Sequence, residues 1–179
     1  MRGQARAEGL AGDADDILIT NGCQQGLDLL ARVLIRPGDA VIVEDPVYPG
    51  LRATLARAGA RLVGVPVTAS GIDTDLLEAE LARTRPRLLV VTPSFQNPTG
   101  GTLPLAGRQA LLQAAARAGT VVVENDVYGD LRYAGEPLPT LRQLDGTGDV
   151  VLVRSFSKIA FPGLRVGWVL GPAPLIARL

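Results

Sequence analysis

Short runs of β-branched residues alternate along the whole chain with segments whose apolar residues recur at helical spacing. Some of the runs are apolar at every position, as in Leu88 to Val91 and Val121 to Val123, which indicates strands that are buried on both faces. Strands of this kind occur in parallel sheets that helices cover on each side. The pattern therefore predicts an α/β domain, a three-layer sandwich with a mostly parallel seven-stranded sheet.

The expected strands are Ile17 to Thr20, Ala40 to Glu44, Arg61 to Val67, Arg87 to Thr92, Thr120 to Asn125, Val150 to Arg154 and Arg165 to Leu170. The expected helices are Leu27 to Ile35, Gly50 to Ala58, Thr74 to Arg83 and Pro104 to Ala118. Asp73 or Thr74 suits a helix N-cap, and Gly119 suits a helix end. In open α/β sheets ligands bind beyond the carboxyl ends of the strands, so we expect the chemistry in the residues that follow each strand.

The composition argues against several kinds of function. Eighteen basic and eighteen acidic residues cancel, and without a basic run there is no reason to expect a nucleic-acid or membrane surface. The apolar stretches are shorter than a membrane helix and no signal peptide is visible, so a cytoplasmic protein is expected. The chain contains no histidine and one cysteine, Cys23, which argues against a zinc site, an internal disulfide and a histidine-based triad.

Lys158 is the only lysine, and every other basic side chain is arginine. Arginine replaces lysine as a positive charge but not as an amine nucleophile, because the guanidinium stays protonated. We therefore expect an amine function at Lys158, with chance as the alternative. Ser155 and Ser157 precede it at the end of a predicted strand, and Arg165 follows seven residues later. Such a cluster suits a phosphorylated ligand whose electrophilic carbon is attacked by an amine.

Polar residues also follow other predicted strands. Gly22, Cys23 and Gln24 lead into a helix, where free amides and the helix dipole favour an anion such as phosphate; a plain strand-to-helix turn is the alternative. Tyr48 follows the second strand and either stacks on a ring or packs against the protein. Asn97 lies in a loop with two prolines and two glycines that fixes its amide in place, although Asn before Pro is also ordinary turn chemistry.

Asp126 follows the fifth predicted strand. A carboxylate at the end of a buried strand is costly unless a cation or hydrogen-bond donors face it. We therefore expect Asp126 to have a charged partner, which is either a bound ligand or an arginine of the chain.

Five short elements, each of which closes a strand, resemble the large domain of class I/II aminotransferases, which are pyridoxal-phosphate enzymes of fold type I. They are Asn21-Gly22-Cys23-Gln24, Asp45-Pro46-Val47-Tyr48, Asn97-Pro98-Thr99-Gly100, Asp126-Val127-Tyr128 and Ser155-Phe156-Ser157-Lys158. The resemblance runs in order from Ile17 to Gly171, nearly the whole chain. Each element alone is a weak signal, and their order makes the signal specific.

The resemblance implies a catalytic set and a cofactor-binding set around pyridoxal 5'-phosphate. Lys158 is expected to form the Schiff base and to shuttle a proton, and Asp126 to pair with the pyridine nitrogen. Asn97 and Tyr128 are expected to hydrogen-bond the phenolic oxygen of the ring, and Tyr48 to stack on the ring. The expected phosphate ligands are the amides of Gly22, Cys23 and Gln24 and the side chains of Ser155, Ser157 and Arg165.

The chain also departs from the family pattern. Cys23 stands where relatives often carry a hydroxyl, so only its amide is expected at the phosphate. Residues 1–16 resemble a partial N-terminal segment, 17–171 the pyridoxal-phosphate-binding large domain and 172–179 the start of a C-terminal region that normally supplies the arginine for the substrate carboxylate. We therefore expect a complete cofactor-binding domain, an incomplete enzyme and, in the full-length form, a homodimer.

Three functions are compatible with this resemblance. The first is an aminotransferase, or a fragment of one, that moves an amino group from an amino acid to a 2-oxo acid in a biosynthetic process. The second is the effector domain of a MocR-group (GntR-like) helix-turn-helix transcription regulator, in which the same fold senses pyridoxal phosphate. The third is an inert fragment. Decarboxylases and carbon-sulfur lyases of this fold share the cofactor residues and stay open as alternatives.

Overall fold

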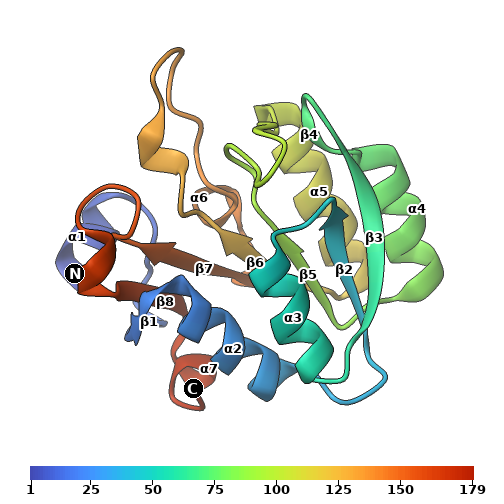
Figure 1. Ribbon diagram of the computed structural model, residues 1–179, viewed down its shortest axis with the longest axis horizontal. Helices are drawn as coiled ribbons and strands as arrows, with labels where there is room; N and C mark the ends of the chain where they lie inside the picture. The colour runs from blue at the N-terminus through green and yellow to red at the C-terminus, as the bar shows by residue number, and fades with distance from the viewer.

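The computed structural model describes residues 1–179 and contains one eight-stranded sheet in the order β1-β8-β7-β6-β5-β2-β3-β4 (Figure 1). The strands are β1 (Asp15–Asn21), β2 (Ala40–Asp45), β3 (Arg61–Thr68), β4 (Gly71–Ile72), β5 (Leu88–Val91), β6 (Val121–Asn125), β7 (Val150–Ser155) and β8 (Val166–Pro172). Strands β3, β2, β5, β6 and β7 pair in parallel, while β8 is antiparallel to both β7 and β1. The predicted α/β fold is confirmed, with the two-residue β4 as an additional strand.

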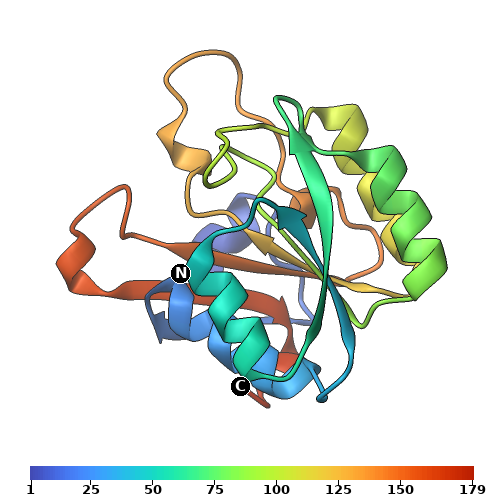
Figure 2. The same cartoon turned by 45° about the vertical axis from the view of Figure 1, so that its right-hand side comes forward.

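Helices cover both faces of the sheet. They are α1 (Arg2–Ala7), α2 (Gly22–Leu34), α3 (Pro49–Arg57), α4 (Thr74–Thr84), α5 (Leu105–Ala118), α6 (Leu141–Leu144) and α7 (Ala173–Ile176). Helices α2 and α3 lie on one face and α4 and α5 on the other, as Figures 1 and 2 show. None of these helices combines the length and the apolar character that crossing a bilayer requires.

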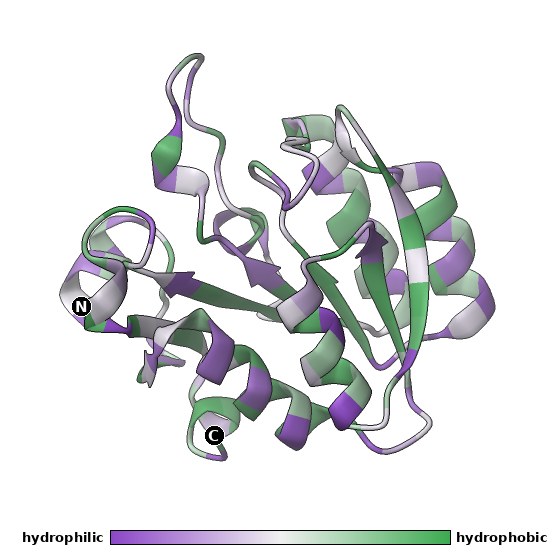
Figure 3. Cartoon of the chain, viewed as in Figure 1, coloured by the Kyte–Doolittle hydropathy of each residue, from purple (hydrophilic) through white to green (hydrophobic).

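The central strands send alternate side chains to the two faces. In β6, Val123 packs in the apolar cluster under α2 and α3, whereas Val122 packs in the cluster under α4 and α5. Figure 3 shows these strands as hydrophobic over most of their length, with hydrophilic residues near their carboxyl ends. The alternation therefore fixes the face on which each polar residue at a strand end lies.

The first and last segments of the chain also pack on this sheet. Leu10 belongs to a small apolar cluster with Leu170 of β8, and Ile176 of α7 packs in the cluster under α2. Arg142 of α6 is buried, donates to the Leu10 carbonyl at 3.1 Å and forms an ion pair with Asp15. The segment before β1 is thereby attached to α6 and β8.

The observed helices differ from the predicted ones mainly at their ends. Helix α2 begins at Gly22 rather than Leu27, whereas α4 begins as expected after Asp73, whose carboxylate accepts from the amides of two residues in the first turn. The short helices α1, α6 and α7 were not predicted. The long connection between β6 and β7 contains α6 and a projecting loop over residues 132–139 (Figure 1).

Candidate cofactor site

Three neighbouring parallel strands end in buried polar residues on the face that α2 covers. Ser155 ends β7, Asn125 ends β6 and Thr92 follows β5. In each strand the residue two positions earlier belongs to the apolar cluster under α2 and α3, so all three side chains share that face. This is the edge of the sheet where α/β proteins bind ligands.

Four of the predicted phosphate ligands lie together at one end of this row. The hydroxyls of Ser155 and Ser157 are 2.8 Å apart, and Arg165 Nη1 is 3.4 Å from Ser157 Oγ. Gly22 begins α2 with φ 73°, and a Cβ there would collide with the Arg165 guanidinium. No side chain caps α2, so amides of its first turn lie beside a cation. Amides, hydroxyls and a guanidinium together suit a phosphate group.

Close packing between β8 and the start of α2 holds this cluster in place. A Cβ on Gly167 would lie 2.6 Å from the Gly22 carbonyl carbon and 2.8 Å from the Cys23 amide nitrogen. Arg165 itself has a left-handed backbone with φ 50°, a conformation that costs energy for a residue with a side chain. Helix and strand therefore meet backbone to backbone, and Arg165 is directed toward the start of the helix.

Lys158 lies in the exposed turn that follows β7. Burial raises the pKa of the half-buried Cys23 thiol, and the charges of Arg165 and then Lys158 partly oppose this shift. The thiol packs against the apolar cluster under α2. Cys23 is therefore a protonated, weakly polar side chain, and its backbone amide is the group that can serve an anion.

Asn97 and Tyr128, the predicted partners of the phenolic oxygen, are in direct contact. Asn97 Nδ2 donates to the Tyr128 hydroxyl at 3.0 Å. The loop that carries Asn97 is held by the buried Gln96, which donates to the Pro46 carbonyl at 2.8 Å and accepts from the Thr99 amide at 3.0 Å. Sequence reasoning missed Gln96, because a glutamine in a proline-rich loop gives no pattern.

Tyr48 and Gln24 lie where α2 and α3 meet. The Tyr48 ring covers Gly50, where a Cβ would be 2.5 Å from ring atoms, and the residue stays 37% exposed. The Gln24 side chain donates to Thr54 Oγ1 of α3 at 2.7 Å, so it links the two helices. Its Oε1 atom is buried without a hydrogen-bond partner.

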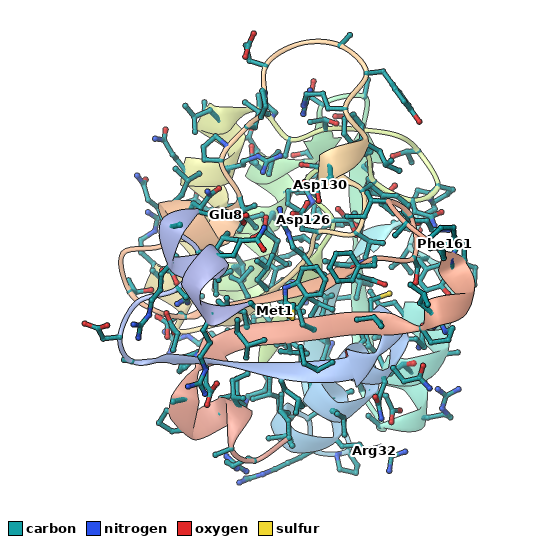
Figure 4. All side chains as sticks on the ribbon, turned by 90° about the vertical axis from the view of Figure 1, so that its left-hand side faces the viewer. Met1, Glu8, Arg32, Asp126, Asp130 and Phe161 are labelled. Carbon is teal, nitrogen blue, oxygen red and sulfur yellow. The ribbon has the colours of Figure 1, made fainter.

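Asp126 lies on the other face of the sheet. Its carboxylate accepts from Arg154 Nε at 2.8 Å and contacts Arg154 Nη2 at 2.6 Å, so the guanidinium binds it through two nitrogens. Arg154 also lies 3.9 Å from the Glu8 carboxylate, near α1. Figure 4 shows Asp126 on the side of the molecule that carries Glu8 and Asp130. The charged partner expected for Asp126 is thus an arginine of the chain.

Two buried glutamates lie outside this cluster. Glu44 accepts from the Thr92 amide at 3.1 Å and from Gln96, and burial raises its pKa to about 8. Glu124 accepts from two amides at the start of α6, and burial, followed by the charge of Asp126, raises its pKa to about 7. No group of three or more histidine, cysteine, aspartate or glutamate side chains is arranged to hold a metal ion.

Comparison with known proteins identifies the family. The sequence model described as "Aminotransferase class I and II" matches residues 2–179. The chain is 41% identical over 176 residues to the 2-aminoadipate transaminase of Thermus thermophilus, which covers 97% of this chain and 44% of that protein. It is also 41% identical over 171 residues to the HTH-type transcriptional regulator TauR of Rhodobacter capsulatus, which covers 96% of this chain and 34% of the regulator.

Solved structures agree with this assignment. The crystal structure of LysN, the alpha-aminoadipate aminotransferase of Thermus thermophilus, complexed with N-(5'-phosphopyridoxyl)-L-leucine, matches with a TM-score of 0.88 and 42% identity over 90% of this chain and 42% of that one. The multiple substrate aminotransferase of Thermococcus profundus matches with a TM-score of 0.94 and 33% identity over 99% of this chain and 45% of that one.

The chain spans less than half the length of these relatives, which include both aminotransferases and transcription regulators. The family match nevertheless covers residues 2–179, and the sheet has the mostly parallel order of an α/β fold. The chain belongs to the class I and II aminotransferase family.

Proposed function

We propose that the chain binds pyridoxal 5'-phosphate through Lys158 and forms the cofactor-binding domain of an aminotransferase that moves an amino group from an amino acid to a 2-oxo acid. One observation carries the proposal. The only lysine of the chain follows the strand end that brings Ser155, Ser157 and Arg165 against the uncapped start of α2. A nucleophilic amine is thereby combined with a phosphate-binding cluster.

The residues present fit this cofactor. Two buried side-chain polar atoms lack a hydrogen-bond partner, Gln24 Oε1 and Asn125 Oδ1, and both belong to the α2 face of the sheet. Buried polar atoms nearly always have a hydrogen-bond partner, so two such atoms on the α2 face support a polar ligand on that face. Gly22 supports it as well, because the side chain it lacks would take the space beside the Arg165 guanidinium.

Each side chain has a chemical task in this proposal. Pyridoxal phosphate, when bound, supplies an aldehyde that condenses with amines and an aromatic ring that withdraws electrons. The amides at the start of α2, the two serine hydroxyls and Arg165 hold the phosphate. Lys158 Nζ would be the amine that condenses with the aldehyde, with loss of water, and in its free form would carry a proton to or from the substrate carbon. Asn97 and Tyr128 orient the phenolic oxygen, and Tyr48 covers the ring.

Borohydride reduction of the cofactor-loaded chain, followed by peptide mass analysis, tests the proposal. The chain offers two amines, Lys158 and the N-terminus, so the assignment has two possible answers. We expect a pyridoxyl adduct on the peptide that contains Lys158 and none there in Lys158→Arg, which keeps the charge and removes the amine. An adduct on the N-terminal amine alone would contradict the proposal.

A second candidate is the effector domain of a MocR-group transcription regulator. It is favoured by the match to TauR, which equals the match to the transaminase in identity. The residues around Lys158 serve both functions, so they do not separate them. Assays of the full-length protein distinguish the two functions. Turnover of an amino acid with a 2-oxo acid supports the enzyme. Cofactor-dependent binding to a DNA operator without turnover supports the regulator.

We also propose that the full-length protein is a cytoplasmic homodimer. Exposed apolar side chains follow Lys158, namely Ile159, Phe161 and Leu164, and Phe161 is 74% exposed. An apolar surface of this kind beside a ligand site suits contact with a second copy. Light scattering of the full-length protein tests this, and a monomer at micromolar concentration would contradict it.

A further inference from the structure

Two neighbouring polar residues at the end of β6, Asn125 and Asp126, point to opposite faces of the sheet. Asn125 stands in register with Val153 of β7, and the Asp126 amide still donates to the Val153 carbonyl at 2.9 Å, so strand geometry continues through Asp126. Odd-numbered residues of β6 lie on the α2 face and even-numbered ones on the other. Asn125 therefore shares its face with Ser155 and the phosphate-binding cluster, and Asp126 does not.

Asp126 is already engaged on its own face. Its side chain is 3% exposed, and its carboxylate is bound through two nitrogens by Arg154, which never loses its charge. Turning the carboxylate away would leave this half-buried guanidinium with the Glu8 carboxylate at 3.9 Å, and leaving a buried charge without its partner is costly. The Asp126 carboxylate is also packed closely against Gly129, because a Cβ on Gly129 would collide with Asp126 Oδ1.

Asn125, unlike Asp126, has a side-chain polar atom without a hydrogen-bond partner. The residue is 6% exposed, Nδ2 lies 3.4 Å from Thr92 Oγ1, and Oδ1 has no hydrogen-bond partner. The two ends of an amide exchange by a flip about its terminal bond. In one orientation Nδ2 donates to Thr92 and Oδ1 is left as an acceptor without a partner. In the other orientation Thr92 donates to Oδ1, and Nδ2 is left as a donor without a partner. In both, Asn125 presents one unused, uncharged polar group to a ligand.

We infer that Asn125, rather than Asp126, faces the ring nitrogen of the bound cofactor, and that this chain therefore offers that nitrogen a neutral amide in place of a carboxylate. The inference rests on the proposed binding of pyridoxal phosphate. A carboxylate beside the ring nitrogen favours its protonated, cationic form, whereas an amide has no charge with which to do so. With Asn125 beside it, the ring nitrogen would stay unprotonated at neutral pH and would accept a hydrogen bond from Asn125 Nδ2.

The consequence is a division between holding the cofactor and activating it. Lys158 and the phosphate-binding cluster do not depend on the ring nitrogen, so covalent attachment is preserved. Electron withdrawal by the ring is weaker when its nitrogen carries no proton, which slows removal of a proton from the substrate carbon. A domain of this kind favours retention of the cofactor over rapid turnover.

Nitrogen NMR of the cofactor itself tests the inference without an activity assay. The wild-type chain is loaded with pyridoxal phosphate carrying ¹⁵N in the ring, and the signal is recorded from pH 6 to pH 9. We expect the position of an unprotonated pyridine throughout. Asn125→Asp is expected to shift the signal to the position of a protonated pyridinium, and Asp126→Asn is expected to leave it unchanged while lowering the free energy of unfolding.

The outcomes separate this inference from the proposed function. A protonated ring nitrogen in the wild type, or a change of protonation caused by Asp126→Asn, would overturn the inference and leave cofactor binding intact. Absence of any bound cofactor signal would overturn both. Because Asn125→Asp introduces a buried charge and can impair folding, the wild-type and Asp126→Asn spectra are sufficient to decide.

Discussion

Two separate features of position 22 require a glycine, its backbone conformation and the closeness of Arg165. Its φ of 73° lies in the left-handed region, and a Cβ would collide with the Arg165 guanidinium. Gly38 has φ 92° with nothing near its Cβ position, so it is a matched control for the backbone requirement alone.

We predict that Gly22→Ala and Gly38→Ala each lower the free energy of unfolding by about 1–2 kcal/mol, the cost of a left-handed residue with a side chain. Only Gly22→Ala should weaken cofactor binding, by about tenfold or more, because only it displaces Arg165. Chemical denaturation and a titration of pyridoxal phosphate measure the two effects. Equal affinities of both variants for pyridoxal phosphate would show that Gly22 and Arg165 are not part of the phosphate site.

Glu44 gives the folded protein a pH dependence. Its pKa is about 8 in the folded state against an ordinary value of 4.5, so between these values the folded state binds the extra proton. The free energy of unfolding therefore falls as the pH rises from about 4.5 to about 8, and Glu124 adds a fall of the same sign up to about pH 7.

We predict that Glu44→Gln removes the larger part of this decline, on the order of a few kcal/mol between pH 5 and pH 8. Glu78→Gln, on the exposed side of α4, serves as the control and should keep the wild-type slope. Urea denaturation across this pH range measures both. A wild-type slope in Glu44→Gln would show that Glu44 titrates normally.

The sequence identifies polar strand ends but not the face on which each lies. Around β6 the three residues from Val121 to Val123 are all valine, so no alternation of polar and apolar residues reveals which positions face α2. The sequence therefore does not show that Asn125 and Asp126 lie on opposite faces, and the predicted role of Asp126 at the ring nitrogen comes from the family resemblance alone. The pairing of Asp126 with Arg154, which lies 28 residues away, depends on the register of β6 against β7.

At the scale of elements, the contact between β8 and the first turn of α2 determines the geometry of the phosphate-binding cluster. Gly167 and Gly171 both lie in β8, but their surroundings differ. A Cβ on Gly167 would press on the backbone of α2, whereas a Cβ on Gly171 would approach Val151 side-chain atoms no closer than 3.4 Å.

We predict that Gly167→Ala lowers the free energy of unfolding by about 1–3 kcal/mol through overpacking, and weakens cofactor binding because the start of α2 moves. Gly171→Ala should change both by much less. Thermal denaturation and cofactor titration of the pair measure the difference. If the two variants behave alike, backbone contact at Gly167 does not position α2.

Helices and strands can be predicted from the sequence where the pattern of apolar residues is long enough to show its period. Helices α2 to α5 and seven strands carry enough apolar residues to show their period. Helices α1, α6 and α7 have six, four and four residues, too few to display a helical period, and β4 has two. The predicted helix begins at Leu27, where the apolar residues at helical spacing begin, whereas α2 begins at Gly22. The first turn of α2 lies against Gly167 of β8, a tertiary contact that the local sequence does not reveal.

At the scale of the whole molecule, a ligand that binds only the folded state stabilises the fold by mass action. At a concentration of 100 times Kd the gain is about 2.7 kcal/mol, which raises Tm by roughly 5–10 °C for a domain of this size.

We predict such an increase in Tm for the wild-type chain with pyridoxal phosphate and a much smaller one with pyridoxal, which lacks the phosphate. Lys158→Arg should show a reduced increase, since it keeps the phosphate-binding cluster and loses the covalent bond. Differential scanning calorimetry measures all three. Equal increases with both compounds would mean that the phosphate is not bound by the cluster at Ser155, Ser157 and Arg165.

The opposite orientations of Asn125 and Asp126 have a genetic consequence. Asparagine and aspartate codons differ by a single nucleotide, so one transition at the Asn125 codon places a carboxylate on the cofactor face. The equivalent change at Asp126 alters only the pair with Arg154 on the far side. A mutational path from slow to rapid turnover therefore begins with one base, and selection for faster transaminase activity in a library of this gene should recover that base first.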